Sequence, residues 1–481
     1  MPIATAPQTP HPHLPAKTLG VLSSWQRSTR DHPLLNKGKD DPLPEDADVV
    51  IIGSGLCSAM TAHTLLKAAN RPKKIVVLEA REICSGASGR NAGHCRPDAA
   101  RGFPAFSSVH GPESTLQVMS SETVVRDRLD EFIRQHNIDC EWNLRDTYDV
   151  CLTDEFKDYS ANALREMRAA GGKPVIDVLD AEEAKKETRV AETVGAYKWK
   201  AATINPAKLT LKISEMNTAM GGYELYAWTP AHGVRQAGDG TSWVVQTSRG
   251  NVKAGKVVFA TNAYSQSVVP ELKDLVVPTR AQAILATPPP VGSEAFPPIK
   301  GSYSLRFLPK EFYSVAPRPD QTIVIGTSRG WKGMPESVRE SMMNTVDDSA
   351  ADPIITKNSY ETFCRLLPEG GWSTEGLEEG TAKGFDHAWA GIIAMTPDAV
   401  PFVGPIPGKE GQFVAAGYNG HGMARIMLCA PALAKYMLHG EWDPEMPEAF
   451  KITEERLERL KVALQKAQLS QTGGAMTNAV V

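Results

Sequence analysis

The sequence predicts an α/β protein in two parts, one with a parallel sheet and one of α+β type with a mostly antiparallel sheet. Residues 49–79 indicate the first part, because a strand, a glycine turn, a helix and a second strand follow one another there. Residues 275–330 indicate the second part, because short β-type runs alternate with Pro and Gly. The 481 residues exceed one simple core, since domains usually hold about 100–200 residues.

Composition and charge exclude several classes of protein. The formal net charge is -4, so no basic field favours nucleic acid, and we expect no nucleic-acid partner. No apolar run reaches the ~20 residues of a membrane span, and the Pro-rich start lacks the apolar core of a secretory signal. The seven cysteines form no CxxC pair. We therefore expect no metal, no disulfide framework, no membrane partner and a cytoplasmic location with reduced thiols.

The remaining elements follow helical or strand periodicity. Helical patterns cover 113–137, 154–170, 207–220, a segment after Gly422, and 453–468. Strand patterns cover 146–153, 242–248, 256–262 and a hairpin at 311–326. Residues 1–45 form an irregular leader in this interpretation, and 331–358 a polar stretch.

The glycines after the first strand predict a site for dinucleotide phosphates. Gly53 permits a tight turn, and Gly55 lets the backbone approach a pyrophosphate without a Cβ in the way. The helix that follows offers unpaired N–H groups and the positive end of its dipole. Ser58 takes the third position, where a small residue allows close packing of helix and strand. The glycines alone would equally suit an ordinary turn.

Glu79 ends the second strand and strengthens this interpretation. It stands near the ~20-residue offset at which an acidic residue accepts hydrogen bonds from ribose hydroxyls. Its alternative role is a solvated carboxylate at a strand end. Together the two features predict a Rossmann-type dinucleotide-binding domain, although they do not separate NAD from FAD.

Four segments together resemble a known family. They are CSGASGRNAGH (84–94), VFATNAY (258–264), WAGIIAMTPDAVP (389–401) and GYNGHGM (417–423). In this order they are similar to the D-amino-acid oxidase / sarcosine oxidase superfamily of FAD enzymes, above all its γ-glutamylputrescine-oxidase-like and fungal members. The resemblance covers about residues 40–445. It implies a Rossmann-type FAD-binding domain built from discontinuous segments, together with a substrate domain.

The resemblance implies a division of the chain and a set of cofactor contacts. The FAD-binding domain would comprise 46–105, 200–268 and 375–450. The substrate domain would comprise 106–199 and 269–374, between an irregular leader (1–45) and a C-terminal helix and tail (451–481). The expected FAD contacts are Gly53, Gly55, Ser58, Glu79, Ser88, Arg90, Asn91, Ala260, Thr261, Gly417, Asn419, Gly420, His421, Gly422 and Met423. The helix after Gly422, with the Met423 N–H, would stabilise reduced flavin. The alternative is that the segment 417–422 is an ordinary glycine-rich loop.

The implied reaction is oxidation of a C–N bond in a primary or secondary amine, a small-molecule substrate. Hydride would pass to flavin N5, and O2 would reoxidise the flavin to give H2O2. Such chemistry needs a positioned substrate and exclusion of water. The candidate catalytic residues are His94, Tyr313, Trp389 and Tyr418, each of which could instead be a core or surface residue. Arg318 and Arg329 lie near the hairpin, and we interpret both as solvated turn charges.

Two departures from the family pattern bear on substrate and cofactor. Ala424 stands where sarcosine-oxidase-like members carry the Lys that holds a substrate carboxylate, so a simple α-amino acid loses one anchor. No cysteine lies between Cys151 and Cys364, where that subgroup tethers FAD, so we expect non-covalent FAD.

Three other functions stay open on the sequence. One is an FAD dehydrogenase or tailoring oxidoreductase of a biosynthetic, secondary-metabolite intermediate. Another is a flavin-binding protein without turnover. An NAD-dependent enzyme fits least, because it leaves the run 417–423 unexplained.

Overall fold

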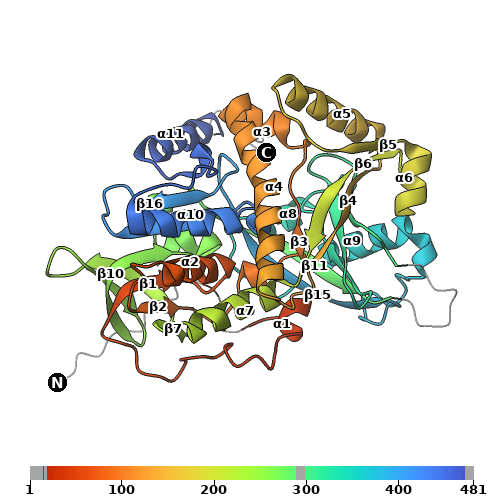
Figure 1. Ribbon diagram of the computed structural model, residues 1–481. Helices are drawn as coiled ribbons and strands as arrows, with labels where there is room; N and C mark the ends of the chain where they lie inside the picture. Colours follow the sequence, from red (N-terminus) through yellow and green to blue (C-terminus); the bar gives the residue numbers. More distant parts are fainter. Residues whose placement is uncertain (1–14, 16–18, 289–297, 472–481) are drawn as a thin grey trace.

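The computed structural model describes residues 15, 19–288 and 298–471, and within these it contains two β-sheets with helices packed around them (Figure 1). The first residues of the leader and the end of the tail lie outside the described residues. In the described part of the chain, no helix combines the length and the apolar character needed to cross a membrane.

The first sheet has a parallel centre. Its parallel strands are β1 (Asp46–Ile52), β2 (Ile75–Leu78), β7 (Tyr223–Tyr226), β10 (Gly250–Phe259) and β17 (Gln412–Ala416). Antiparallel strands extend it: β8 (Ala231–Gln236), β9 (Trp243–Thr247) and β16 (Phe402–Pro405). The order β16-β17-β10-β1-β2-β7 places β1 in the middle. Residues 49–52 are buried, which explains their continuous β-branched run.

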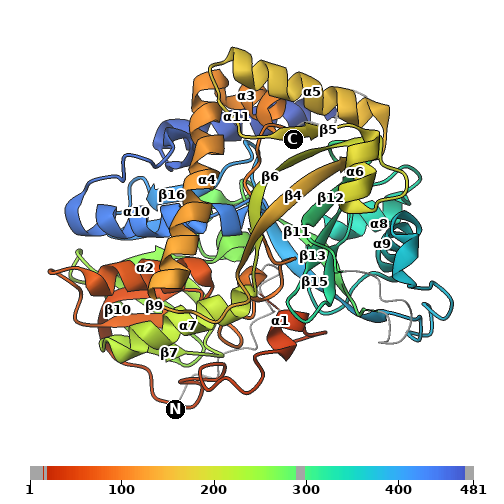
Figure 2. The same cartoon turned by 45° about the vertical axis from the view of Figure 1, so that its right-hand side comes forward.

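Three helices pack side by side in front of this sheet in Figure 1: α2 (Leu56–Lys67), α7 (Pro206–Ala219) and α10 (Ile426–His439). The long helix α4 (Pro112–Gln135) packs against α10 and stands between the two sheets in both ribbon views (Figure 2). The other helices are α1 (Ser24–Arg27), α3 (Phe103–His110), α5 (Asp154–Ala169), α6 (Ala181–Thr188), α8 (Glu336–Met342), α9 (Pro353–Leu366) and α11 (Glu454–Gln471).

The second sheet is mostly antiparallel and curved (Figure 2). Its strands are β3 (His94–Cys95), β4 (Asn143–Cys151), β5 (Asp177–Leu179), β6 (Gly195–Thr203), β11 (Val277–Ala286), β12 (Ser302–Arg306), β13 (Phe312–Pro317), β14 (Ile323–Gly326) and β15 (Phe385–Met395). The order is β15-β11-β14-β13-β12-β4-β6-β3, and β4 and β12 form a parallel pair. The predicted fold class, a dinucleotide domain with an α+β partner, is confirmed.

The two faces of the second sheet differ in chemistry because side chains alternate along each strand. Tyr148, Tyr303 and Tyr313 lie on one face, in an apolar cluster that also contains residues of α9. On the opposite face the register places Asp149 beside Ser304, and both line a cavity. A buried polar face of this kind needs partners for every polar group, so it indicates a functional surface.

Residues 19–45 of the leader are an integral part of the fold. Ser23 caps α1, and its hydroxyl donates to the Gly89 carbonyl at 2.5 Å. The Trp25 ring is buried, and its Nε1 donates to the Asn91 carbonyl at 2.6 Å. The leader therefore holds the loop 84–94 in place.

Strand pairing differs from the predicted division of the chain at two positions. β15 falls within 375–450 but pairs with β11 of the second sheet. β3, within 46–105, pairs with the end of β6. Local patterns show that a strand exists but carry no information about its pairing partner, so these strands could not be placed from sequence. The domain boundaries stay a prediction. The polar stretch 331–358 contains α8 and the start of α9.

Candidate active site

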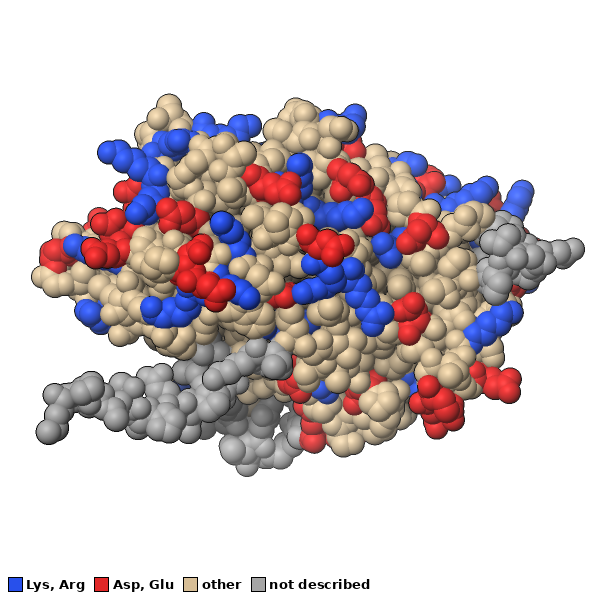
Figure 3. Space-filling model, turned by 90° about the horizontal axis from the view of Figure 1, so that it is seen from below, with Lys and Arg blue, Asp and Glu red and all other residues tan. Residues whose placement is uncertain are grey.

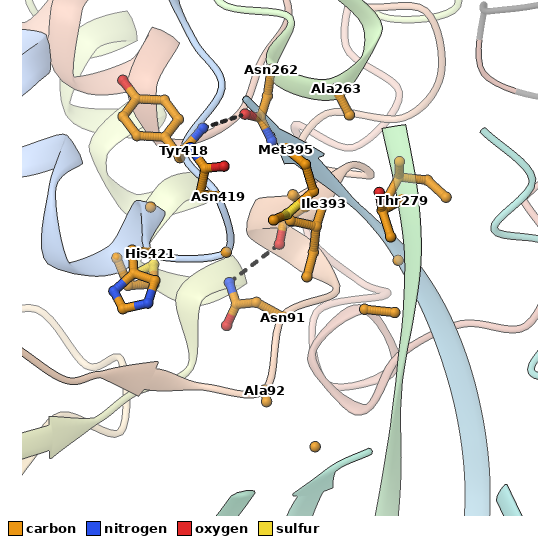
Figure 4. A pocket seen from close by; sticks show the side chains of 18 of the residues that line it. Asn91, Ala92, Asn262, Ala263, Thr279, Ile393, Met395, Tyr418, Asn419 and His421 are labelled. Carbon is orange, nitrogen blue, oxygen red and sulfur yellow. Dashed lines mark hydrogen bonds between the residues drawn. The ribbon is translucent and has the colours of Figure 1, made fainter. Parts of the chain in front are cut away.

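A cavity of about 1080 Å³ is lined by residues of both sheets and of the loops that follow β1, β2 and β17. Figure 4 shows part of its wall, where Asn91, Asn262, Ile393, Asn419 and His421 lie around one space. Ends of parallel strands commonly meet at such a crevice, and ligands bind there. The cavity is thus the candidate active site.

Backbone geometry at the start of α2 suits a bound phosphate. Gly53 has φ +101°, and a Cβ there would lie 2.6 Å from the Ala260 carbonyl oxygen. A Cβ at Gly55 would lie 3.0 Å from the Ser88 hydroxyl, which accepts from the Leu56 N–H at 2.9 Å. The N–H groups of Gly55 and Cys57 line the cavity without an acceptor among the described residues. Such free N–H groups at a helix start attract anions.

The Glu79 carboxylate is held in the cavity wall by backbone and hydroxyl donors. Its Oε2 accepts from the Ser54 N–H at 3.0 Å and from the Ser54 hydroxyl at 2.6 Å. Its Oε1 accepts from the Arg81 N–H at 3.0 Å. These bonds fix the carboxylate at the end of β2, where the nucleotide ribose binds in Rossmann-type folds.

Asparagine side chains fix the glycine-rich loop 417–423 at the other end of the cavity. Asn262 Oδ1 accepts from the N–H groups of Gly417 and Tyr418 at 3.2 and 3.3 Å (Figure 4). Asn419 Oδ1 accepts from the Thr396 N–H at 2.8 Å. The loop thereby carries the Met423 N–H to the cavity, and this group has no acceptor in the described part of the chain.

His94 lines the cavity as a neutral imidazole. Burial, with the nearby charges of Arg96 and Arg145, lowers its pKa to about 3. Neither ring nitrogen has a hydrogen-bond partner within the described residues. Unpaired buried nitrogens in a cavity wall indicate that a ligand completes the site.

A buried carboxylate on α4 lies behind His421. Glu122 Oε1 lies 3.4 Å from His421 Nδ1 and 3.0 Å from Arg425 Nε, and Oε2 accepts from the Asp98 N–H at 2.8 Å. Burial would raise the pKa of Glu122, but His421 and Arg425 outweigh burial and lower it to about 2. The ionised carboxylate favours a proton on His421 Nδ1 and leaves Nε2 as an acceptor.

The second sheet contributes a cluster of charged side chains to the same cavity. Asp149 Oδ1 accepts from Arg96 Nη2 at 2.9 Å and from Arg306 Nε at 2.8 Å, and Arg101 Nε lies 3.9 Å from Oδ2. Burial would raise the pKa of Asp149, but the three arginines hold it well below its ordinary value.

Comparison with known proteins decides the identity of the cofactor. Residues 48–436 match the family described as FAD-dependent oxidoreductase (DAO). The chain belongs to this family. The predicted resemblance and the predicted FAD cofactor are therefore confirmed, and the protein is an FAD-dependent enzyme.

Relatives and solved structures extend this finding. The chain is 24% identical over 429 residues to a probable oxidoreductase OrdL of Haemophilus influenzae, covering 86% of this chain and 89% of the relative. It is 28% identical over 241 residues to γ-glutamylputrescine oxidoreductase of Escherichia coli, covering 49% and 54%. Glycine oxidase of Geobacillus kaustophilus has the same fold, with a TM-score of 0.65, 22% identity and coverage of 85% and 99%.

The cavity fits FAD at both ends. The free N–H groups of Gly55 and Cys57 would hold the pyrophosphate, and the Glu79 carboxylate would accept from the ribose. The Met423 N–H would face the flavin. This N–H belongs to a short 3₁₀ turn, Gly422–Ala424, because α10 begins only at Ile426.

Most of the predicted FAD contacts come together in the cavity wall. Those in the wall are Gly53, Gly55, Glu79, Ser88, Arg90, Asn91, Ala260, Thr261, Asn419, Gly420, His421, Gly422 and Met423. Ser58 and Gly417 lie behind the wall: Ser58 is fully buried in α2, and Gly417 supports the loop. The Arg90 guanidinium donates to the carbonyls of Val21 and Ala390, so it links the leader to β15.

Two of the four predicted catalytic residues lie outside the wall. Tyr313 occupies the apolar face of β13, where its hydroxyl donates to Asn358 Oδ1 at 2.6 Å, while its neighbours Phe312 and Ser314 face the cavity. Trp389 is fully buried, with Nε1 donating to the Arg90 carbonyl at 2.9 Å. Strand register turns Tyr313 away from the cavity, whereas Trp389 shares a face of β15 with Gly391 and packs against the backbone of Arg90.

His94 and Tyr418 do line the cavity. The Tyr418 hydroxyl lies 3.3 Å from Cys57 Sγ and points away from the other labelled side chains in Figure 4. Burial raises the pKa of this hydroxyl well above its ordinary value. Tyr418 therefore supplies a wall rather than an acid or base.

Several residues in or near the site had roles that the sequence did not indicate. Glu122 lies in a helix that carries no motif, so no local signal marked it. Asn262 was visible within the segment 258–264, and its position shortly after the end of β10 was the available signal. Arg318 and Arg329 are not solvated turn charges: Arg318 binds Glu141 at 3.0 Å, and Arg329 lines the cavity.

Proposed function

We propose that this FAD-dependent enzyme oxidises the C–N bond of a primary or secondary amine, with O2 as the electron acceptor and H2O2 as the reduced product. The observation that carries the proposal is the Glu122–His421 pair, which places an imidazole acceptor in the cavity wall. His421 belongs to the glycine-rich loop 417–423, called the flavin-facing loop below because its Met423 N–H would face the flavin. Bound FAD supplies the two-electron acceptor. Residues of this chain would have to position the amine, remove its proton and keep water away from it.

The imidazole of His421 would take the proton of an incoming ammonium group. An amine gives up electrons from its C–H bond only when its nitrogen is neutral, and alkylamines arrive protonated at neutral pH. Glu122 supports proton transfer because its ionised carboxylate compensates the positive charge that His421 then carries. The pair thus supplies a base of the kind that amine oxidation requires.

The neighbouring wall is partly apolar, which would help to exclude water from the donor carbon. Ile393 and Met395 of β15, together with Ala92, line this space (Figure 4). His94 is neutral because its pKa is about 3. Such a wall suits an uncharged donor carbon above the flavin.

The relatives support an amine as the donor. One is named γ-glutamylputrescine oxidoreductase and others are named glycine oxidase, so the named donors carry an amino group. The cytoplasmic location expected from the thiols stays a prediction, as does O2 as the acceptor.

The test is a reduction experiment on the purified flavoprotein. Under anaerobic conditions, primary and secondary amines should bleach the visible flavin absorbance, and admission of air should restore it with formation of H2O2. Bleaching without H2O2 would replace the oxidase by a dehydrogenase. No bleaching by any amine, with dithionite as the positive control for reducible flavin, would refute amine oxidation.

A further inference from the structure

Three guanidinium groups converge on one carboxylate in the cavity wall. Arg96 follows β3, Arg101 precedes α3, and Arg306 ends β12, whereas Asp149 lies on β4. Arg96 and Arg306 each hydrogen-bond Asp149 Oδ1, and Arg101 binds Asp98 Oδ2 at 2.6 Å. All five side chains line the cavity.

Aromatic rings and a hydroxyl hold two of these arginines in fixed positions. The Arg96 guanidinium lies 4.4 Å from the Trp199 ring, and Arg96 Nε donates to Thr147 Oγ1 at 2.8 Å. The Arg306 guanidinium lies 4.2 Å from the Phe312 ring. Stacked and bridged guanidinium groups lose little freedom on binding an anion, so the cluster is preorganised.

Each arginine keeps donors for a ligand. Nη1 of Arg96, Nη1 of Arg101 and Nη2 of Arg306 have no partner among residues 19–288 and 298–471. The buried hydroxyl of Ser304, beside Asp149, also has no partner there. Because the free nitrogens belong to different arginines, a carboxylate here would accept charge-assisted hydrogen bonds from more than one guanidinium group.

The charge balance of the cluster favours one more anion. Three guanidinium groups face two carboxylates, those of Asp98 and Asp149, which leaves one excess positive charge. Burial, together with the charge of Arg101, lowers the pKa of Arg306 to about 10. A buried excess charge is costly until an opposite charge arrives, and one carboxylate would neutralise it.

This positive wall is a property of the cavity rather than of the whole molecule. The chain has a net charge of -4, and on the face in Figure 3 basic and acidic side chains are intermixed. The side chains labelled near the flavin-facing loop in Figure 4, apart from His421, are uncharged or apolar. The cluster of Arg96, Arg101 and Arg306 is therefore a local feature of the cavity and not part of a generally basic surface.

We propose that the cluster of Arg96, Arg101 and Arg306 binds a carboxylate at the end of the substrate remote from the oxidised C–N bond. The substrate class is a linear amine with a terminal carboxylate. This inference rests on the proposed amine oxidation. A monoanion fits the single excess charge better than a doubly charged phosphate ester does.

Arg329 offers a competing position for the anion. It lines the cavity, and its Nη1 contacts Met395 Sδ at 3.5 Å, a weak acceptor. Met395 lies in the wall near the flavin-facing loop (Figure 4). A carboxylate bound by Arg329 would lie beside the oxidised carbon, as in an α-amino acid. The experiment must therefore separate the two positions.

The kinetic experiment compares amines that differ only in the carboxylate. The probes are γ-aminobutyrate, δ-aminovalerate and ε-aminocaproate, the corresponding alkylamines, and norvaline as the α-amino acid. The wild type should prefer at least one terminal carboxylate over its alkylamine by about tenfold or more in kcat/KM. Arg96→Gln should abolish that preference, so that the kcat/KM ratio of each acid to its alkylamine falls to about one. Arg134→Gln, on the exposed face of α4, is the matched control.

A binding experiment makes the result independent of turnover. Glutarate, a dicarboxylate without an amine, should bind the oxidised holoenzyme in calorimetry, and Arg96→Gln should weaken its binding about tenfold. If Arg96→Gln lacks its FAD absorbance, Arg101→Gln, which loses the bond to Asp98, takes its place. Arg96-dependent glutarate binding without oxidation of any amine would support the anion site and refute the proposed function.

Two results would overturn the inference while leaving amine oxidation intact. One is equal oxidation of acids and alkylamines with no effect of Arg96→Gln. The other is transfer of the carboxylate preference to norvaline, with loss of that preference in Arg329→Gln but not in Arg96→Gln.

Discussion

Glu122 and His421, which are 299 positions apart in the sequence, meet at 3.4 Å between Oε1 and Nδ1. The carboxylate is buried on α4, and the imidazole lines the cavity with its side chain 32% exposed. The buried carboxylate of Glu122 orients the accessible imidazole of His421 and stabilises the positive charge that the imidazole gains on protonation.

Removal of this pair should slow amine oxidation without loss of FAD. His421→Asn should lower kcat/KM by about 10²–10⁴, the usual contribution of a positioned base. Glu122→Gln should lower it by about tenfold to a hundredfold, because Glu122 acts through His421. The double variant should be no slower than His421→Asn, since residues that act as a unit are not additive.

Steady-state kinetics with the best amine tests this expectation. Glu131→Gln, an exposed change on the same helix, is the control. Flavin absorbance per protein confirms that each variant is folded. Additive losses in the double variant would contradict a shared role.

Gly53→Ala should prevent FAD binding. Its φ of +101° strains any other residue, and a Cβ would meet the Ala260 carbonyl oxygen at 2.6 Å. The turn between β1 and α2 would have to open to relieve this contact. The N–H groups of Gly55 and Cys57 would then no longer point together towards the phosphate site. The variant should purify with less than about a tenth of the wild-type flavin, since strain of this kind costs about 1–3 kcal/mol. Gly238→Ala, where a Cβ meets nothing within 4 Å, should keep its flavin.

Features formed by residues that are close together in the sequence could be predicted. Gly53, Gly55 and Glu79 lie within one βαβ unit, so their spacing alone placed them at one strand edge. The order of four segments indicated the family, which the family match confirms. The helix that carries Glu122 was predicted from its periodicity as well, although the role of Glu122 was not.

The parts that sequence could not supply depend on register and on contacts between distant segments. Tyr313 and Phe312 are adjacent, yet only Phe312 faces the cavity, and one residue of register decides which does. The arginine cluster joins Arg96, which follows β3, with residues of β4 and β12, and these segments share no motif. The leader carried no signal that Trp25 would bind the Asn91 carbonyl.

The flavin should be released by acid, because no suitable thiol attacks it. All seven cysteines are free, and Cys57 lines the cavity. Burial raises the pKa of the Cys57 thiol to about 11, so it stays protonated, and the protonated thiol is a poor nucleophile. Precipitation with trichloroacetic acid should leave the flavin in the supernatant. Flavin that stays in the wild-type pellet but not in the Cys57→Ser pellet would reveal a tether.

The depressed pKa of His94 should make the folded enzyme sensitive to acid. The pKa falls from 6.5 to about 3 on burial beside Arg96 and Arg145, so the folded state keeps the ring neutral. As the pH drops from 6.5 towards 3, the unfolded chain binds a proton here and the folded chain does not. The contribution of His94 to the free energy of unfolding is therefore fully present above pH 6.5 and is lost as the pH falls towards 3.

Urea unfolding of the FAD-saturated wild type and of His94→Asn measures this loss. Asparagine is neutral at every pH, so between pH 7 and pH 5 the wild type should lose about 2 kcal/mol more than the variant. His232→Asn, at an exposed position on β8, should follow the wild type. Parallel losses in the wild type and His94→Asn would mean that the folded protein protonates His94, and the cavity wall would then carry a positive charge where the amine is expected to bind.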